Sequence, residues 1–186
     1  MGSESRANHV GHRARRQYYF AGILLVLSWV SLPFVLTEPG VLYGAALYYG
    51  WVFLWGLRNL GLHQDSEGTL YETLGAGFWV TWLRVIPLGV LVGLLGKLSL
   101  LIEFPWLVFG LYSWVMVLDA VDGSAARAAG RISAFGARLD NQTDALGILT
   151  ASLFAIHLGV LPWAYLLLSA CYLFFHLGLR LRDGLG

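Results

Sequence analysis

The chain has 186 residues, of which 58% are hydrophobic and only 12% are charged, and its mean hydropathy is +0.66. A soluble domain carries about 25% charged residues, so this composition excludes an ordinary water-soluble protein. The net charge of +1 provides no basic field and argues against a nucleic-acid partner. The length is typical of one domain, and eight Trp, nine Tyr and ten Phe suit the two aromatic belts of a membrane protein.

Six stretches are long and apolar enough to cross a bilayer, which requires about 20 such residues. We therefore expect an all-α fold, a polytopic bundle of six transmembrane helices. The expected spans are Tyr18 to Leu36, Gly40 to Leu57, Phe78 to Leu100, Pro105 to Ala129, Ser133 to His157 and Pro162 to Leu179. On this basis residues 1–17 form a basic cytoplasmic segment, 18–57 a transmembrane hairpin, 58–77 a cytoplasmic linker or interfacial helix, and 78–186 the core.

Basic residues predict the orientation, because cytoplasmic loops of membrane proteins are enriched in Lys and Arg. If the N-terminus is cytoplasmic, eleven of the twelve basic residues fall on that side and only Lys97 falls outside. Both termini are therefore expected in the cytoplasm, with the protein in the inner or plasma membrane if its source is a prokaryote. His9, His12 and His63 are expected to be solvated.

Four aspartates interrupt two of the expected spans near their cytoplasmic ends. Ionisable residues at membrane depth are costly without partners, so they mark functional sites. Asp119 and Asp122 are three residues apart, and Asp140 and Asp144 are four apart, so each pair shares a helix face. The short turn between the helices makes them antiparallel neighbours whose acidic faces can converge. Carboxylates that close require cations between them, and Mg²⁺ or Mn²⁺ fits oxygen ligands.

The segment from Asp119 to Asp144 reads D-x2-D-G-x2-A-R-x8-G-x3-D-x3-D, with every fixed position filled. It resembles the signature of the CDP-alcohol phosphatidyltransferase family (class I). In the preceding helix, Thr81 and Arg84 resemble the family's Thr-x-x-Arg, and the resemblance extends over about Gly75 to Arg180. It implies an enzyme of phospholipid biosynthesis in which an acceptor hydroxyl attacks the phosphorus distal to cytidine and CMP is released.

The resemblance also implies roles for individual residues. Asp119, Asp122 and Asp140 would hold two divalent cations, and Asp144 would both bind a metal and act as the general base. The expected donor is CDP-diacylglycerol and the expected acceptor a small polar alcohol; a CDP-linked headgroup with a lipid acceptor is the reverse alternative. Membrane lipids and a second copy of the chain, in a homodimer, are further expected partners. The CDP site is assigned to Asp119, Thr81, Gly123, Ala126 and Arg127, and acceptor or phosphate contacts to Arg84, Gly136 and Arg138.

The order of the helices departs from the family. Members generally carry the signature in the second and third of six helices, whereas here it lies in the fourth and fifth expected spans. One explanation is circular permutation, in which the leading pair takes the places of the missing last pair, since an even number of helices can move without inverting the rest. The alternative is a truncated core with an unrelated N-terminal hairpin.

Two other functions use similar residues. A membrane prenyltransferase also holds Mg²⁺-diphosphate on aspartates, but in two separated DxxxD-like clusters that no Gly-x2-Ala-Arg follows. A cation transporter would carry its acids near the middle of the membrane, on broken helices in paired repeats. Because the four aspartates gather at one membrane face, the sequence favours the transferase.

Overall fold

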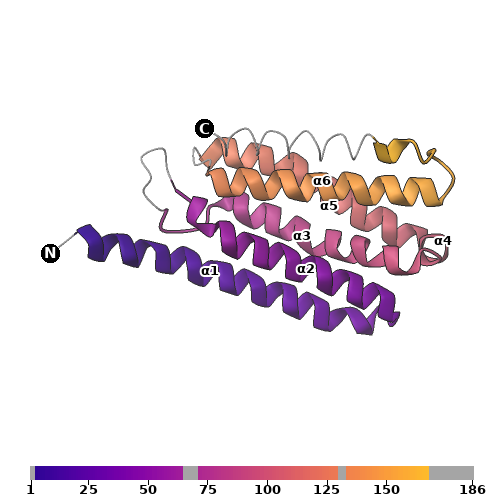
Figure 1. The fold of residues 1–186 in the computed structure, drawn as a ribbon, viewed down its shortest axis with the longest axis horizontal. Helices are drawn as coiled ribbons and strands as arrows, with labels where there is room; N and C mark the ends of the chain where they lie inside the picture. Colours follow the sequence, from indigo (N-terminus) through magenta and orange to yellow (C-terminus); the bar gives the residue numbers. More distant parts are fainter. Residues whose placement is uncertain (1–2, 65–70, 130–132, 168–186) are drawn as a thin grey trace.

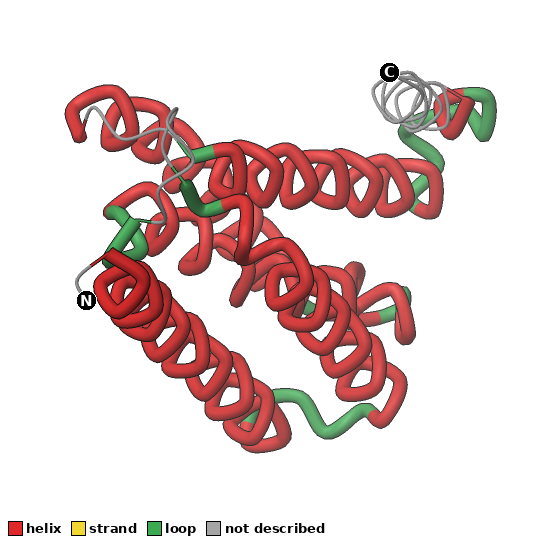
Figure 2. Tube along the Cα trace, turned by 60° about the vertical axis from the view of Figure 1, so that its left-hand side comes forward, coloured by secondary structure: helices red, strands yellow, loops and turns green. Residues whose placement is uncertain are grey.

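The computed structural model describes residues 3–64, 71–129 and 133–167, with side chains described for residues 12–64, 71–121 and 133–167. Within these ranges helices joined by short loops make up the chain, and no strand is present (Figure 2). The long helices run back and forth along one axis (Figure 1). The α-helices are α1 (Ser3–Ser31), α2 (Pro39–Asn59), α3 (Ala76–Leu94), α4 (Leu100–Glu103), α5 (Pro105–Ala129) and α6 (Ala134–His157), and single turns η1 (Leu32–Phe34), η2 (Leu60–Leu62) and η3 (Leu95–Lys97) follow the first three.

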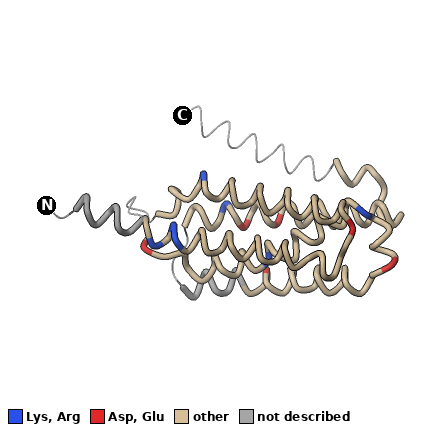
Figure 3. Tube along the Cα trace, turned by 90° about the horizontal axis from the view of Figure 1, so that it is seen from below, with Lys and Arg blue, Asp and Glu red and all other residues tan. Residues whose placement is uncertain are grey.

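Three described segments are long and apolar enough to cross a membrane: His12–Phe34, Pro39–Leu62 and Ala76–Lys97. A shorter apolar stretch, Pro105–Val121, forms most of α5. Most of the length of these helices carries no charged residue (Figure 3). The structure is thus the expected all-helical bundle, with helices at the first five expected spans. The sixth, Pro162 to Leu179, lies mostly outside the described residues, and six crossings with cytoplasmic termini stay a prediction.

The first helix is longer than its apolar pattern indicates. α1 begins at Ser3 rather than near Tyr18, so the basic N-terminal segment continues the first membrane helix. Arg and Ala are strong helix formers, and no proline precedes Pro33, so nothing in the basic segment stops the helix. Gln17 of this helix accepts a hydrogen bond from the Leu74 backbone N–H at 2.7 Å, which ties the connection before α3 to α1. The described residues 71–75 of that connection are irregular.

α3 lies at the centre of the bundle, in contact with α2, α5 and α6. Very little of this helix can face lipid, because its side chains are covered on several sides. Five large side chains are each at most 1% exposed: Trp82, Val85, Leu88, Leu91 and Leu94. Any polar group on α3 must therefore find its partner inside the protein, because lipid offers none.

Aromatic side chains join the first three helices by hydrogen bonds to backbone carbonyls. Trp82 Nε1 of α3 donates to Ala21 O of α1 at 2.9 Å. Tyr49 Oη of α2 donates to Ile86 O of α3 at 2.6 Å. Hydrogen bonds between helices matter in a membrane, where lipid chains are as apolar as the helix surfaces and association depends on packing and polar contacts.

α2 and α3 approach each other closely along glycines. A Cβ atom added to Gly44 would lie 2.9 Å from Gly93 Cα, and one added to Gly96 would lie 2.5 Å from Gly40 O. Side chains at these positions would collide with the opposite backbone. Small residues that allow such an approach are typical of interfaces between membrane helices.

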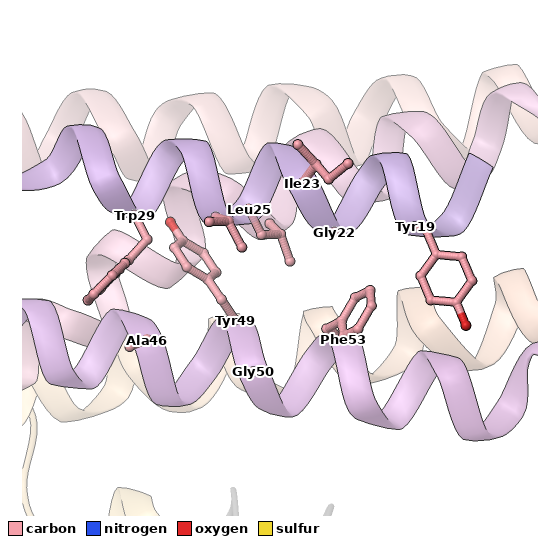
Figure 4. Close-up of a pocket in the computed structure, with 10 residues that line it drawn as sticks. Tyr19, Gly22, Ile23, Leu25, Trp29, Ala46, Tyr49, Gly50 and Phe53 are labelled. Atoms are coloured by element: carbon pink, nitrogen blue, oxygen red, sulfur yellow. The ribbon is translucent and has the colours of Figure 1, made fainter. Parts of the chain in front are cut away.

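α1 and α2 line an open pocket of about 530 Å³ (Figure 4). Its walls are almost entirely apolar, and Figure 4 shows the rings of Trp29 and Phe53 beside it. Tyr49 also lines the pocket, but its hydroxyl adds no free polar group there because it donates a hydrogen bond to Ile86 O of α3. The pocket is lined by Tyr19, Gly22, Ile23, Leu25, Val26, Trp29, Ala46, Tyr49, Gly50 and Phe53.

The N-terminal hairpin also contacts α6. The ring of Phe135, in the first turn of α6, lies 6.2 Å from the Tyr18 ring of α1 and 6.3 Å from the Trp55 ring of α2. A single closed bundle requires contacts of this kind, whereas a hairpin docked outside the core does not. The final expected helix lies mostly outside the described residues, so the circular permutation stays a prediction.

Replacing Gly93 with Ala should weaken the packing of α2 on α3, because the added Cβ would lie 2.5 Å from Val41 O. Overpacking of this kind lowers the free energy of unfolding by about 1–3 kcal/mol, which a thermal unfolding curve in detergent measures. Gly110→Ala is the matched control, since nothing lies within 4 Å of its added Cβ and Ala favours helix over Gly. Equal stability of the two variants would contradict the close approach.

Candidate metal centre

Charged side chains from three helices meet at one place in the bundle. Asp119 of α5 and Asp140 and Asp144 of α6 bring one carboxylate oxygen each to within 4.8 Å of one another. Arg84 of α3 joins them: its Nη1 lies 3.0 Å from Asp119 Oδ1 and 2.7 Å from Asp140 Oδ1, and its Nη2 donates to Asp144 Oδ1. The convergence expected from the spacing is thus present for three of the four aspartates. The side chain of Asp122 is not among those described.

The local structure explains why these groups meet. Asp140 and Asp144 are four residues apart on α6, so Asp144 lies about one turn beyond Asp140 on the same face of the helix. Like charges at this spacing repel in an isolated helix, so the pair needs a cation. α3 contacts both α5 and α6 and supplies that cation with Arg84.

Burial and charge are unequal across the cluster. The Arg84 side chain is 2% exposed, whereas those of Asp119, Asp140 and Asp144 are 44%, 40% and 35% exposed. A buried guanidinium is tolerated only with anionic partners, and it has three. Three carboxylates and one guanidinium leave an excess of two negative charges on the partly exposed side of the cluster.

The residues present fit divalent cations. Mg²⁺ and Mn²⁺ prefer oxygen ligands, and the centre offers three carboxylates close together. Their excess negative charge favours a cation, and their exposure allows it to enter. Asp119, Asp140 and Asp144 would hold such an ion, with Asp122 one turn further along α5. A metal ion there would stabilise the negative charge on a phosphoryl group during its transfer.

A hydrogen-bond network fixes the start of α6. Ser133 is the N-cap, and its Oγ accepts from the Gly136 N–H at 3.1 Å. His63 Nδ1 lies 3.0 Å from the same Oγ, and His63 Nε2 lies 3.1 Å from Thr73 O. The Thr73 carbonyl only accepts, so Nε2 carries a proton; in the neutral imidazole the Ser133 hydroxyl then donates to Nδ1. The network thus joins both sides of the linker to the helix that carries two of the aspartates.

This location of His63 corrects the expectation that it is solvated. The residue is 6% exposed, and burial holds its pKa below the ordinary value for histidine, while the Thr73 carbonyl acts in the opposite direction. The neutral form of His63 is therefore favoured at pH 7. Sequence reasoning recognised neither partner, because His63 and Ser133 are 70 positions apart. A serine directly before a helix is a readable N-cap signal, but it does not name the histidine.

The other predicted site residues lie in different surroundings. Thr81 is 3% exposed, and its hydroxyl donates to Gly77 O within α3 at 3.1 Å. Arg138 is exposed on α6, two residues before Asp140 and therefore on roughly the opposite side of the helix. Gly136 contributes its N–H to the cap described above. Side chains at Gly123, Ala126 and Arg127, in the last turns of α5, lie outside those described.

Residues 78–181, more than half of the chain, match the family model described as CDP-alcohol phosphatidyltransferase. The chain belongs to this family. The match includes α3, α5 and α6, and with them every charged group of the metal centre, whereas α1 and α2 precede it. No curated protein and no solved structure matches the chain. The resemblance inferred from the aspartate spacing is confirmed, and family and apolar helices together identify an integral membrane protein of a transferase family.

Replacing Arg84 with Met should destabilise the metal-free protein, because three converging carboxylates lose their cation. Loss of a buried partner costs about 3–5 kcal/mol, and the exposure of the carboxylates puts the expected loss at or below about 3 kcal/mol. Thermal unfolding in EDTA measures it, and added Mg²⁺ should stabilise the variant more than the wild type. Arg138→Met is the control, since it removes an exposed arginine that lies on roughly the opposite side of α6 from Asp140. A variant as stable in EDTA as the wild type would show that Arg84 does not hold the cluster.

Proposed function

We propose that the protein is an integral membrane phosphotransferase of phospholipid biosynthesis, which transfers a phosphatidyl-type group from CDP-diacylglycerol to a small polar alcohol and releases CMP. The observation that carries this proposal is the convergence of Asp119, Asp140 and Asp144 in a chain that belongs to the CDP-alcohol phosphatidyltransferase family. The family match disfavours the two other functions considered above, prenyl transfer and cation transport.

The surroundings of Asp119 support a lipid-linked donor. On α5, Met116, Val117 and Val121 flank it and are exposed apolar residues. An exposed apolar surface on a membrane helix faces lipid, so the half-exposed carboxylate borders the lipid phase. A donor with acyl chains can approach the centre laterally while its headgroup remains at the carboxylates. This supports CDP-diacylglycerol over the reverse arrangement with a CDP-linked headgroup.

Each aspartate has a proposed task. Asp119, Asp122 and Asp140 hold divalent cations, which offset the charge of the diphosphate. Gly123, Ala126 and Arg127 follow Asp119 on α5 and contact the CDP moiety; glycine leaves space beside the backbone, and arginine can bond phosphate oxygens in pairs. Thr81 supports this site from within α3.

Asp144 is the proposed general base. A carboxylate oxygen close to the acceptor hydroxyl takes its proton as the oxygen attacks the phosphorus distal to cytidine, and CMP leaves with the electrons of the broken P–O bond. Asp144 shares Arg84 with Asp140 and Asp119. The guanidinium is therefore suited to orient the base and to contact phosphate or acceptor. Gly136 and Arg138, at the start of α6, keep their proposed acceptor or phosphate role, with Arg138 reaching the acceptor from the side of the helix opposite Asp140.

The N-terminal hairpin has a proposed structural task. α1 and α2 occupy the places of the last two helices of other family members and close the bundle as a circular permutation. The contacts of Tyr18 and Trp55 with Phe135 support this. The positive-inside bias of the sequence supports both cytoplasmic termini and a centre on the cytoplasmic side.

Purified protein in detergent should release radiolabelled CMP from CDP-diacylglycerol when Mg²⁺ or Mn²⁺ and the right acceptor are present. Glycerol 3-phosphate, inositol, inositol phosphate and serine are the acceptors to screen, and CDP-linked headgroups with diacylglycerol test the reverse arrangement. Exhaustive EDTA treatment should abolish release, because the carboxylates alone repel a diphosphate. Turnover that survives EDTA would contradict the assignment of the aspartates as metal ligands.

Asp144→Asn should reduce turnover by about 10²–10⁴-fold, the usual loss when a general base is removed. The amide keeps one oxygen, so binding of the CDP donor should fall less than the rate. Asp119→Asn is the comparison, because it changes an expected metal ligand without touching the base. If Asp144→Asn keeps the wild-type rate while Asp119→Asn is inactive, the base is a different residue.

A further inference from the structure

The pocket between α1 and α2 is a feature that the roles assigned above leave unexplained. Its walls are almost entirely apolar, and two of the side chains that line it, Ile23 and Val26, are 54% and 59% exposed. Both helices belong to segments that are long and apolar enough to cross a membrane. The pocket therefore opens towards lipid, and whatever fills it has to be apolar.

Gly50 indicates that the space is not left over from protein packing. It lines the pocket, and nothing lies within 4 Å of a Cβ atom added to it. Elsewhere on α2 a glycine is required by an opposite backbone, as at Gly44 against Gly93. Glycine inside a helix is destabilising relative to alanine, and no contact within the described chain requires it at Gly50. The open space beside it thus indicates a molecule from outside the chain.

The pocket has the length of an acyl chain in one leaflet. On α1 its lining runs from Tyr19 to Trp29, which is about 15 Å of helix. Half of the hydrocarbon core of a bilayer is also about 15 Å thick. Tyr19 lies at one end of the pocket and Trp29 at the other (Figure 4). At that second end Trp29 joins the two helices, because its Nε1 donates to Leu42 O of α2 at 2.9 Å.

A basic side chain lies just beyond the Tyr19 end. Arg15 is four residues before Tyr19 on the continuous helix α1, so both are on the same face. Arg15 is exposed and forms no ion pair with any described residue, whereas Arg13 pairs with Glu72 at 3.8 Å. The apolar span begins at His12, which puts Arg15 at the level of the lipid headgroups, where long basic side chains reach the surface.

We propose that this pocket binds an anionic phospholipid of the bilayer, with one acyl chain between α1 and α2 and the phosphate at Arg15. The charge at one end and the apolar walls match the two parts of such a molecule. A second copy of the chain fits less well, because a two-fold dimer would bring both Arg15 side chains to the same level of the membrane, where like charges repel.

This lipid is distinct from the proposed donor. The residues that line the pocket lie on α1 and α2, whereas the charged groups of the metal centre lie on α3, α5 and α6. Its task is structural, since a chain that fills the space between α1 and α2 stabilises the hairpin.

The test is native mass spectrometry of the full-length protein in detergent, titrated with dioleoylphosphatidylglycerol, which is anionic, or dioleoylphosphatidylcholine, which is zwitterionic. The wild type should bind one phosphatidylglycerol about fivefold more tightly than phosphatidylcholine, the effect of one basic residue on an anionic lipid. Phosphatidylglycerol should also raise the temperature of thermal unfolding, because a ligand that binds only the folded state stabilises it.

Gly50→Leu tests the acyl-chain part of the site. The variant should lose tight binding of both lipids, because the added side chain enters the pocket without meeting the protein. In lipid-free detergent it should unfold at the wild-type temperature or above, since leucine favours helix over glycine. Gly110→Leu is the matched control: nothing lies within 4 Å of its added Cβ either, but Gly110 is on α5, so lipid binding should be unchanged.

Arg15→Gln tests the headgroup part. It should lower the affinity for phosphatidylglycerol about fivefold and leave that for phosphatidylcholine unchanged. Arg58→Gln is the control, because Arg58 is an exposed arginine in the last turn of α2, five residues after Phe53 and so about 140° around the helix from this pocket residue. It should keep the preference for phosphatidylglycerol.

Equal affinities of the wild type for the two lipids would overturn the inference, as would wild-type lipid binding by Gly50→Leu. A preference lost equally in Arg15→Gln and Arg58→Gln would overturn it too, because general surface charge would then explain the binding. A lipid-free dimer that Gly50→Leu converts to a monomer would show a second copy in the pocket and contradict the lipid. None of these readouts depends on CMP release, so each outcome judges this inference apart from the proposed reaction.

Discussion

A guanidinium buried in the middle of a membrane bundle is the constraint on which the other features depend. Arg84 is 2% exposed, and neither lipid nor water can satisfy it. Its partners come from α5 and α6, so these helices must keep a fixed register on α3. A slip of one residue along α6 would rotate Asp140 and Asp144 by about 100° and leave the charge buried without them.

Uncharged contacts hold that register from the other side of α3. Gly44 and Gly93 let the backbones of α2 and α3 touch, and Tyr49 ties α2 to the carbonyl of Ile86. Phe135 then connects α6 to the hairpin through Tyr18. Lipid provides little driving force for helix association, so such close contacts replace the hydrophobic effect of a soluble core. The hairpin thereby supports the charged cluster without contributing a charge to it.

Sequence periodicity predicted what depends on neighbours along one helix, and missed what depends on contacts across the fold. The shared face of Asp140 and Asp144 follows from their spacing, and the helices follow from runs of apolar residues. The contact of Arg84 with acceptor or phosphate stays a prediction, but its ion pairs with carboxylates up to 60 positions away were not foreseen. The partner of His63 is 70 positions away. No pattern within a single helix contains such pairs, and the early start of α1 was missed because charged helix formers look like a solvated tail.

The charge imbalance separates this cluster from an ordinary structural ion pair. A structural pair needs balanced charges that bury each other, but here three carboxylates surround one arginine and remain 35–44% exposed. By itself this arrangement repels the diphosphate of a nucleotide. Bound divalent cations would reverse the sign of the field on the exposed side, and the metal-loaded centre would then attract the diphosphate that the bare carboxylates repel. A metal-loaded centre would thus differ in charge from the one described here, while the charge of the buried arginine stays the same in both.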